Sequence, residues 1–361
     1  MDEDRAVLSS QRPLTELYDV ALLDLDGVVY LGERVIDHVP DALASAREQG
    51  MRLAFVTNNA SRTPAQVAEL LTRLGVPAAS TDVITSSHAA AHYLADRFPS
   101  GAAVLVLGTT GLIDALTERG LRPVFSADDN PVAVVQGYSP TMDWAALAEG
   151  MVAIRNGALW VATNLDPTVP SPRGPLPGNG SLVAALRHAS GQEPVATGKP
   201  DPTMHAESVQ RSKARQPLVV GDRLDTDIEG ARRADCASLL VLTGVTRPLD
   251  LLAAEPVHRP DYVAADVRGL LESHPDVHAV GGGFRCGAVT AVETGSMLRV
   301  SIAEKAQGTK ADSDLTDERV NLLRALAQAA WAIADAGRRR APIEAADDRA
   351  AQLLKAWDLV E

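Results

Sequence analysis

Residues 20–30 read Val20-Ala21-Leu22-Leu23-Asp24-Leu25-Asp26-Gly27-Val28-Val29-Tyr30. This apolar, β-capable run leads into two aspartates that are two residues apart, and a glycine follows them. In an extended chain Asp24 and Asp26 point to the same side, at the mouth of a buried strand. Each carboxylate raises the pKa of the other unless a cation lies between them, and Mg²⁺ would relieve that repulsion. The alternative is a strand that ends in two solvated acids, which is a common composition for a turn.

The bulk composition excludes several classes of protein. A length of 361 residues favours two domains, or one domain with a large insertion. The hydrophobic content of 46% supports a sizeable core, and the aromatic content of 4% makes that core aliphatic. A net charge of -13 argues against a nucleic-acid partner, whose phosphates require a basic face. Two distant cysteines, Cys236 and Cys286, fit a reducing cytosol and predict neither a disulfide framework nor a zinc site.

We expect neither a secretory signal nor a membrane span. The chain begins Met1-Asp2-Glu3-Asp4 without a basic region, and no apolar run approaches the roughly 18 residues that a membrane span needs. The expected location is therefore the cytoplasm.

Strand and helix patterns alternate along the chain, which predicts a parallel sheet covered by helices. Thr63-Pro64-Ala65-Gln66 combines an N-cap residue, a proline at the first helical position and a capping glutamine, so a helix should begin there. Asp166 to Gly180 is rich in Pro and Gly and predicts a long loop. The strands expected after the first are residues 52–56, 83–85, 104–108, 132–135, 159–163, 218–221 and 238–242.

Four polar segments are expected at strand ends, where open α/β sheets bind ligands. Taken singly, each has an ordinary interpretation as a turn, a solvated surface lysine or a helix N-cap. Taken together, they supply a nucleophile, a proton donor, a metal site, a cation and neutral donors, which is what phosphoryl transfer requires. The segments are the Asp24/Asp26 pair, Thr57-Asn58-Asn59, Thr197-Gly198-Lys199-Pro200 and Gly221-Asp222-Arg223-Leu224-Asp225-Thr226-Asp227.

In this order the four segments resemble the haloacid dehalogenase (HAD) superfamily of phosphatases. The nearest branch is the NagD-like, or p-nitrophenyl-phosphatase-like, group, which includes phosphoglycolate, pyridoxal-phosphate and glycerol-3-phosphate phosphatases. The segment Ala162-Thr163-Asn164-Leu165-Asp166-Pro167-Thr168 and the Pro-rich loop after it also resemble that branch. The resemblance covers roughly residues 18–273.

The resemblance implies a role for each matching residue. Asp24 would attack phosphorus and form an aspartyl-phosphate, while Asp26 would protonate the leaving oxygen and later activate water. The Asp24 carboxylate, the Asp26 backbone carbonyl and the Asp222 carboxylate would hold Mg²⁺. Asp227 would orient metal-bound water or Lys199. The residues that would bind the phosphate oxygens are Thr57, Asn58, Asn59 and Lys199.

Motif spacing separates chemistries within this superfamily. A second acid at Asp26 favours hydrolysis of a phosphate ester over dehalogenation. Thr57 follows Asp24 by only 33 residues, too few for the small helical cap that phosphomutases carry there. Lys199 follows Thr57 by 142 residues, which leaves room for an α/β cap. A phosphotransferase or mutase, and a phosphate-ester sensor that signals through the C-terminal part, remain the alternatives.

We therefore expect an α/β fold with a Rossmann-like core, an inserted α/β cap of the C2 type and a small α+β C-terminal domain. The expected boundaries are an N-terminal extension at 1–17, the core at 18–88 and 191–273, the cap at 89–190, a linker at 274–283 and the C-terminal domain at 284–361.

A polar cap favours a small hydrophilic phosphate ester, such as a glycerol, glycolate or sugar phosphate. Asn164, Asp166 and the loop 170–180 are the candidates for specificity, although the first two could equally serve only to hold that loop. The expected partner is a small phosphorylated metabolite, with neither nucleic acid nor membrane, and a homodimer is left open.

The C-terminal segment should form a hairpin within residues 284–303, an amphipathic helix over 315–336 and a shorter helix over 349–357. It loosely resembles a fragment of the GNAT-type N-acetyltransferase fold. It lacks an Arg/Gln-x-x-Gly-x-Gly/Ala run to hold a pyrophosphate, so acetyl transfer is not expected. Packing, dimerisation or ligand-dependent regulation is more plausible. The apolar stripe Leu322, Leu326, Ala329 and Ile333 could serve these roles or simply fill the domain's own core.

Overall fold

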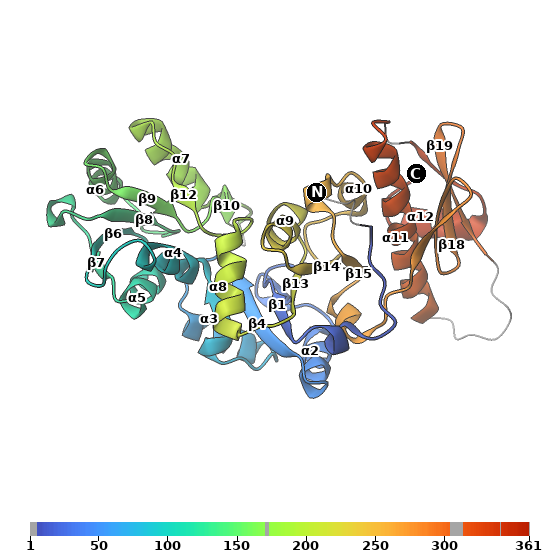
Figure 1. Cartoon of the computed structure of the whole chain (residues 1–361), viewed down its shortest axis with the longest axis horizontal. Helices are drawn as coiled ribbons and strands as arrows, with labels where there is room; N and C mark the ends of the chain where they lie inside the picture. Colours follow the sequence, from blue (N-terminus) through green and yellow to red (C-terminus); the bar gives the residue numbers. More distant parts are fainter. Residues whose placement is uncertain (1–5, 170–172, 304–312, 340, 361) are drawn as a thin grey trace.

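The computed structural model describes residues 6–169, 173–303, 313–339 and 341–360 (Figure 1). Three groups of elements, each built on one main sheet, follow one another along the long axis of the molecule (Figure 1). We call them the cap unit, the central unit and the C-terminal unit. The α/β fold class expected from the sequence is confirmed.

The central unit contains a six-stranded parallel sheet in the order β15-β14-β13-β1-β4-β5. All four residues of β1, Val20–Leu23, are buried, as expected of a strand covered on both faces. Because β4 pairs with one side of β1 and β13 with the other, the strand order reverses at β1. Ligands bind at such a point in open α/β sheets. The other strands are β4 Arg52–Thr57, β5 Val83–Thr85, β13 Pro217–Gly221, β14 Ala237–Val241 and β15 Tyr262–Ala264.

Helices cover this sheet, and a small hairpin leaves it directly after the two aspartates. The hairpin, β2 Tyr30–Leu31 and β3 Arg34–Val35, was not predicted. The capping box at the start of α3 was predicted correctly, because Thr63 and Gln66 exchange side-chain to backbone hydrogen bonds of 2.9 and 3.3 Å. The helices are α1 Leu14–Leu17, α2 Val39–Glu48, α3 Pro64–Arg73, α8 Pro202–Ser212, α9 Glu229–Arg233 and α10 Pro248–Leu252.

The cap unit is inserted between β5 and β13 and has a five-stranded parallel sheet in the order β12-β9-β8-β6-β7. The Pro/Gly-rich segment between β9 and α7 is not a plain loop, since β10 Thr168–Val169 and β11 Leu176–Pro177 pair as a short antiparallel ribbon. The strands of the main sheet are β6 Ala103–Leu107, β7 Arg122–Val124, β8 Ala133–Gln136, β9 Leu159–Ala162 and β12 Val195–Ala196. The helices are α4 Ser86–Ala95, α5 Thr110–Glu118, α6 Trp144–Arg155 and α7 Asn179–Ser190.

A buried carboxylate joins the cap unit to the central unit where α4 and α5 meet α8. The Glu207 side chain on α8 has no exposed surface, and it contacts His92 of α4 at 2.7 Å. Arg119, directly after α5, contacts the same carboxylate at 2.6 Å, and Arg211 of α8 lies at 3.5 Å. One end of the cap is thereby held by contacts to a carboxylate that is fully buried.

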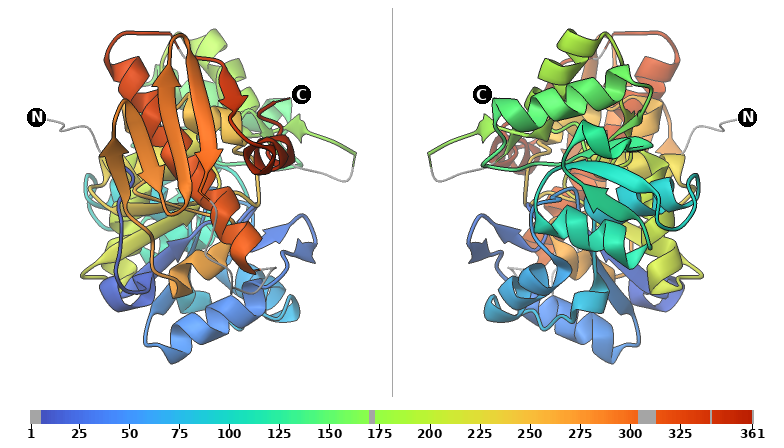
Figure 2. Two further views of the ribbon diagram at one scale, coloured as in Figure 1. Left: turned by 90° about the vertical axis from the view of Figure 1, so that its right-hand side faces the viewer. Right: turned by 90° about the vertical axis from the view of Figure 1, so that its left-hand side faces the viewer.

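The C-terminal unit has a five-stranded sheet in the order β16-β17-β18-β19-β20, antiparallel except for the last pair. Residues 274–283 were expected to form a linker, but they contain β16 and the buried His274. In the left view of Figure 2 the sheet faces the viewer, and α11 lies behind it. The elements are β16 Val277–Val280, β17 Gly283–Cys286, β18 Val289–Thr294, β19 Met297–Ile302, β20 Ile343–Ala345, α11 Ser313–Asp335 and α12 Asp348–Ala356.

Helix α11 packs between the C-terminal sheet and the central unit. The predicted stripe of Leu322, Leu326, Ala329 and Ile333 is buried, but not in a core of its own. These side chains share one hydrophobic cluster with residues of the central unit, among them Leu240, Leu251 and Val263. The stripe therefore lies in a core that the C-terminal unit shares with the central unit, so the domain's own core extends beyond the domain.

Within the described ranges, no helix has the length and apolarity needed to cross a membrane.

Candidate active site

The carboxyl ends of β1, β4 and β13 open into a cavity of about 460 Å³ between the central sheet and the cap unit. Nine of the ten residues singled out from the sequence line this cavity, although they come from both units and from distant parts of the chain. They are Asp24, Asp26, Thr57, Asn58, Asn59, Asn164, Asp166, Lys199 and Asp222. The tenth, Asp227, lies just behind the cavity, bonded to Lys199.

Lys199 lies between two carboxylates at the floor of the cavity. Its Nζ donates to Asp24 Oδ1 at 2.5 Å and to Asp227 Oδ1 at 2.6 Å, and also to the Val56 carbonyl at 3.3 Å. Burial alone would lower the pKa of Lys199, but the charges of Asp227 and Asp24 raise it above the usual lysine value. The ammonium group therefore stays charged in the site.

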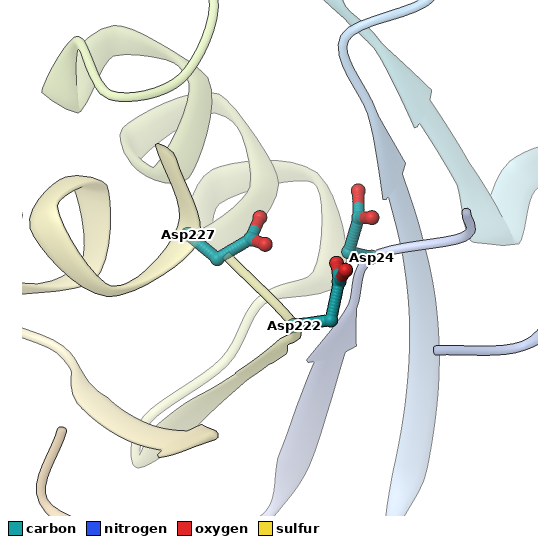
Figure 3. A group of neighbouring side chains, drawn as sticks. All are labelled: Asp24, Asp222 and Asp227. Atoms are coloured by element: carbon teal, nitrogen blue, oxygen red, sulfur yellow. The ribbon is translucent and has the colours of Figure 1, made fainter. Parts of the chain in front are cut away.

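Three carboxylates converge beside that single ammonium group. One oxygen each of Asp24, Asp222 and Asp227 lies within 4.8 Å of the others (Figure 3). Burial raises the pKa of Asp24 well above its usual range, and the charges of Asp227 and Asp222 add to this while Lys199 opposes it. With Lys199 as the counter-charge, two negative charges remain to be balanced, which suits a divalent cation.

Asp222 carries the clearest sign of a missing positive group. It is fully buried, and its Oδ2 accepts a 2.6 Å hydrogen bond from the Val245 N–H, while Oδ1 has no hydrogen-bond partner among the described residues. Burial, followed by the charge of Asp227, raises the pKa of Asp222 to about 6. A buried oxygen without a donor is costly unless a cation contacts it. Clustered carboxylate oxygens are the ligands that Mg²⁺ prefers, so the residues fit such an ion.

Two glycines make this close packing of Asp222 achievable. A β-carbon at Gly244 or at Gly27 would overlap the Asp222 carboxylate, and Gly27 also has a φ of +87°. The Thr243 hydroxyl holds the Gly27 carbonyl at 2.6 Å. The glycine after the aspartate pair therefore serves the turn and the fit of Asp222 together.

Asp26 occupies a different environment from Asp24. It lies in the tight turn after β1, where the Val29 and Tyr30 N–H groups donate to the Leu25 carbonyl, and its side chain is exposed to the cavity. The loss of hydration within this recess raises the pKa of the Asp26 carboxyl, while Arg62 and Lys199 oppose the shift. The two aspartates thus differ in burial and in partners, which is the condition for different chemical roles.

The Thr57-Asn58-Asn59 segment forms a hydrogen-bonded loop at the end of β4. Thr57 Oγ1 accepts from the Asn59 N–H at 3.1 Å, and Asn59 Oδ1 accepts from the Ser61 N–H at 2.8 Å. The Asn58 side chain accepts from the Lys199 N–H at 2.9 Å and donates to the Lys199 carbonyl at 3.1 Å. The side chains of Asn58 and Asn59 are therefore engaged within the protein.

The two candidate specificity residues of the cap also contact Asn58. Asn164 Nδ2 donates to the Asn58 carbonyl at 2.7 Å, and Asn58 Nδ2 donates to Asp166 Oδ2 at 3.4 Å. Asn164 Oδ1 accepts from the Asp166 N–H at 3.2 Å, so both side chains help to hold their loop. Burial raises the pKa of Asp166. Residues 170–172 of the predicted specificity loop lie outside the described residues.

Several lining residues had not been singled out from the sequence, among them Leu31, Tyr138, Arg223 and Val245. Arg223 could have been, because it lies within the acidic loop, where Asp225 binds it at 2.8 and 3.1 Å. A π-helical turn, Leu224–Ile228, then returns the chain so that Asp227 reaches Lys199. No feature of the neighbouring sequence indicates that the other three line the cavity, because only the tertiary fold brings them there. They are Leu31, Tyr138 and Val245.

Known families match three parts of the chain. Residues 21–122 match a family described as haloacid dehalogenase-like hydrolase, and residues 196–270 match a HAD-hydrolase-like family. Residues 287–359 match a GCN5-related N-acetyltransferase like domain, which confirms the expected resemblance of the C-terminal segment.

One curated relative and one solved structure span nearly the whole chain, and a second relative covers about two thirds of it. A D-glycerol 3-phosphate phosphatase of Mycobacterium tuberculosis is 44% identical, over 97% of this chain and 96% of that protein. The 5'-nucleotidase YutF of Bacillus subtilis is 38% identical, over 64% of this chain and 89% of its own. A crystal structure of a glycerol phosphate phosphatase of M. tuberculosis in complex with magnesium superimposes with a TM-score of 0.85 and 43% identity, covering 97% of this chain and 100% of that one. The chain therefore belongs to the haloacid dehalogenase-like hydrolases.

Proposed function

We propose that the chain is a Mg²⁺-dependent phosphatase that hydrolyses small phosphate monoesters through an aspartyl-phosphate on Asp24, with glycerol 3-phosphate among its good substrates. The observation that carries the proposal is the cavity floor, where Asp24 and Asp26 lie beside Lys199 and an incompletely paired Asp222. The 44% identical relative named as a D-glycerol 3-phosphate phosphatase supports the choice of substrate.

The Asp24 and Asp222 carboxylates, together with the Asp26 backbone carbonyl, would hold the magnesium ion. The similar structure in complex with magnesium supports the choice of metal, and the convergence of Asp24 and Asp222 supports the choice of ligands. When bound, the ion supplies positive charge that neutralises the phosphate oxygens as charge develops on them. Lys199 supplies a second positive charge, and Asp227 and Asn58 keep that lysine in place through its Nζ and its backbone.

Asp24 is the nucleophile in this proposal. One of its carboxylate oxygens attacks phosphorus, and the bond from phosphorus to the alcohol oxygen breaks as the aspartyl-phosphate forms. Thr57 and the backbone N–H of Asn58 would hold the phosphate oxygens, since the Asn58 side chain is already bonded to Lys199 and Asp166. Held in this way, the phosphate group would present its phosphorus atom to Asp24.

Asp26 carries the proton. Its raised pKa favours a carboxylic acid that can donate a proton to the leaving alcohol oxygen. The resulting carboxylate then takes a proton from water, whose oxygen attacks phosphorus of the aspartyl-phosphate. Inorganic phosphate leaves, and both aspartates return to their starting states.

The test is phosphate release from purified protein with Mg²⁺, over a panel of esters, in the wild type and two variants. Asp24→Asn should abolish turnover. Asp26→Asn should slow it by about 10²–10⁴-fold for poor leaving groups and by less for p-nitrophenyl phosphate, which needs little protonation. Asp41→Asn, at an exposed position on α2, is the matched control and should be unchanged.

Four outcomes would each contradict a part of the proposal. Substantial activity of Asp24→Asn would exclude it as the nucleophile, and equal slowing of good and poor leaving groups by Asp26→Asn would exclude the proton-transfer role. Turnover of glycerol 3-phosphate no better than that of p-nitrophenyl phosphate would exclude the substrate assignment. Transfer of the phosphoryl group to a second alcohol, without free phosphate, would indicate a phosphotransferase.

A further inference from the structure

Aliphatic side chains line the outer part of the cavity whose floor is charged. Leu31 comes from the β2–β3 hairpin, Val245 from the loop after β14, and Pro167 and Val169 from the cap segment that leads into and forms β10. Leu31 is 55% exposed and Val245 is 62% exposed, whereas Lys199 and Asp222 at the floor are buried. We call Leu31, Pro167, Val169 and Val245 the apolar wall.

Single exposed aliphatic side chains need no explanation, but the convergence of several on one cavity does. The wall residues come from three separate segments of the chain, on both sides of the cavity. Apolar side chains gathered at the mouth of a ligand site are suited to cover an apolar part of a ligand. Besides Lys199 at the floor, Arg223 lines the same cavity, and Asp225 binds its guanidinium, so the wall offers little to a charged substituent.

The cavity is also larger than a three-carbon phosphate ester requires. Its volume of about 460 Å³ falls within the range of roughly 300–1,000 Å³ that accommodates drug-sized ligands. If the phosphate group lies at Asp24 and Lys199, the glycerol part lies next to the polar side chains of Asn164 and Asp166. The space beside the apolar wall is then left for a further substituent.

We propose that the site also accepts glycerol phosphates in which the far hydroxyl carries a short acyl chain, with that chain packed on the apolar wall. The inference rests on the proposed phosphatase function and extends its substrate class from glycerol 3-phosphate to 1-acyl-glycerol 3-phosphates. The chemistry is unchanged, because the same phosphorus–oxygen bond breaks and the same primary alcohol leaves.

The test uses the full-length protein with Mg²⁺ and a series of water-soluble 1-acyl-glycerol 3-phosphates from acetyl to hexanoyl. Leaving-group chemistry is constant across this series, so a change in kcat/KM reports on the chain alone. Complete burial of a CH₂ group strengthens binding by about fourfold. Because the wall is partly open to solvent, kcat/KM should rise by about two- to fourfold for each added CH₂ group. The effect should appear mainly in KM.

Variants of the wall separate this explanation from others. Leu31→Ser, and independently Val245→Ser, should reduce the ratio of hexanoyl to acetyl kcat/KM, and both side chains are exposed enough for the fold to tolerate the change. Val152→Ser is the matched control, because Val152 is 45% exposed on α6 and does not line the cavity. That control should keep the wild-type ratio.

If kcat/KM in the wild type stays constant or falls as the acyl chain lengthens, the inference is overturned. The wall residues would then pack against one another and not against the ligand. An unchanged ratio in both wall variants would overturn it equally. Glycerol 3-phosphate is assayed in parallel. If it is hydrolysed while longer esters gain nothing, the inference fails and the proposed function stands; if no ester is hydrolysed, the proposed function fails.

Discussion

Replacement of Trp331 by alanine should destabilise the hydrolase as a whole, although the residue lies in the C-terminal unit. Trp331 is on α11, is 1% exposed and belongs to the hydrophobic cluster that both units share. Its indole N–H donates a 2.9 Å hydrogen bond to the Leu251 carbonyl of α10, and its ring lies 5.2 Å from the Arg259 guanidinium. Arg259 is itself bound to Asp335 of α11 at 2.6 and 2.7 Å. The substitution therefore removes contacts across the junction.

The size of the effect follows from these contacts. Truncation of a buried tryptophan to alanine costs about 3–5 kcal/mol. A buried carbonyl left without its donor adds about 1–3 kcal/mol. These contributions overlap, so we expect a loss of at least about 4 kcal/mol, which is a large share of the roughly 5–15 kcal/mol by which proteins are stable. With a urea dependence of about 1–3 kcal/mol per molar, the unfolding midpoint should fall by more than about 1 M.

The assay is equilibrium urea unfolding followed by far-ultraviolet circular dichroism and, in the same samples, by residual phosphate release. Both signals should change in one transition in the wild type, and both should shift together in Trp331→Ala. Trp144→Ala is the matched control, because Trp144 is 83% exposed on the cap and its loss should change stability by no more than about 0.5 kcal/mol. Activity that survives the loss of C-terminal structure, or a Trp331→Ala midpoint equal to that of the wild type, would refute the shared-core reasoning.

Two further predictions concern the metal site and the response to pH. Gly244→Ala should lower the affinity for Mg²⁺ by about 10–100-fold, because the new β-carbon would displace the Asp222 carboxylate. The measurement is a Mg²⁺ titration of phosphate release. The control Gly281→Ala, with no described atom within 4 Å of its β-carbon, should match the wild type in that titration. Acidification should destabilise the protein through His274, whose pKa is lowered to about 4 by burial and by the Arg324 guanidinium that donates to its Nδ1. Between pH 6.5 and 4 the unfolded chain binds a proton that the folded chain does not, so the free energy of unfolding should fall by up to about 3 kcal/mol across this window. His274→Gln should show a smaller fall between pH 7 and pH 5 in urea titrations, and an equal fall would contradict the assignment.

The parts of the fold that sequence reasoning predicted well are those with a local cause. Apolar runs that end in polar residues marked the strands that carry Asp24, Thr57 and Asp222, and Thr63 with Gln66 marked a helix start. Because parallel strands place their carboxyl ends on one edge, the order of the motifs was enough to bring these residues to one cavity.

The parts that were missed depend on partners far away in the sequence. The periodicity of α11 shows which face is apolar, but it does not show that Leu240 and Val263 of another unit cover that face. From the sequence Leu31 looks like any surface residue, but the β2–β3 hairpin brings it to the cavity that Val245 also lines. The segment 274–283 was rich in glycine and therefore expected to be a linker, yet its strand β16 is paired by β17.

The buried Glu207 cluster has a mechanical consequence for catalysis. It attaches one edge of the cap to α8, the helix that begins just after Lys199. The cap also contacts Asn58 of the central unit through Asn164 and Asp166, just before β10, so a swinging cap would have to break these hydrogen bonds while the Glu207 contacts stay in place. Substrate would then enter beside Asn164 and Asp166, and Lys199 would keep its contacts to Asp24 and Asp227 throughout each catalytic cycle. High salt should weaken these contacts less than it weakens exposed ion pairs, since the Glu207 carboxylate is buried and the arginines are only partly exposed.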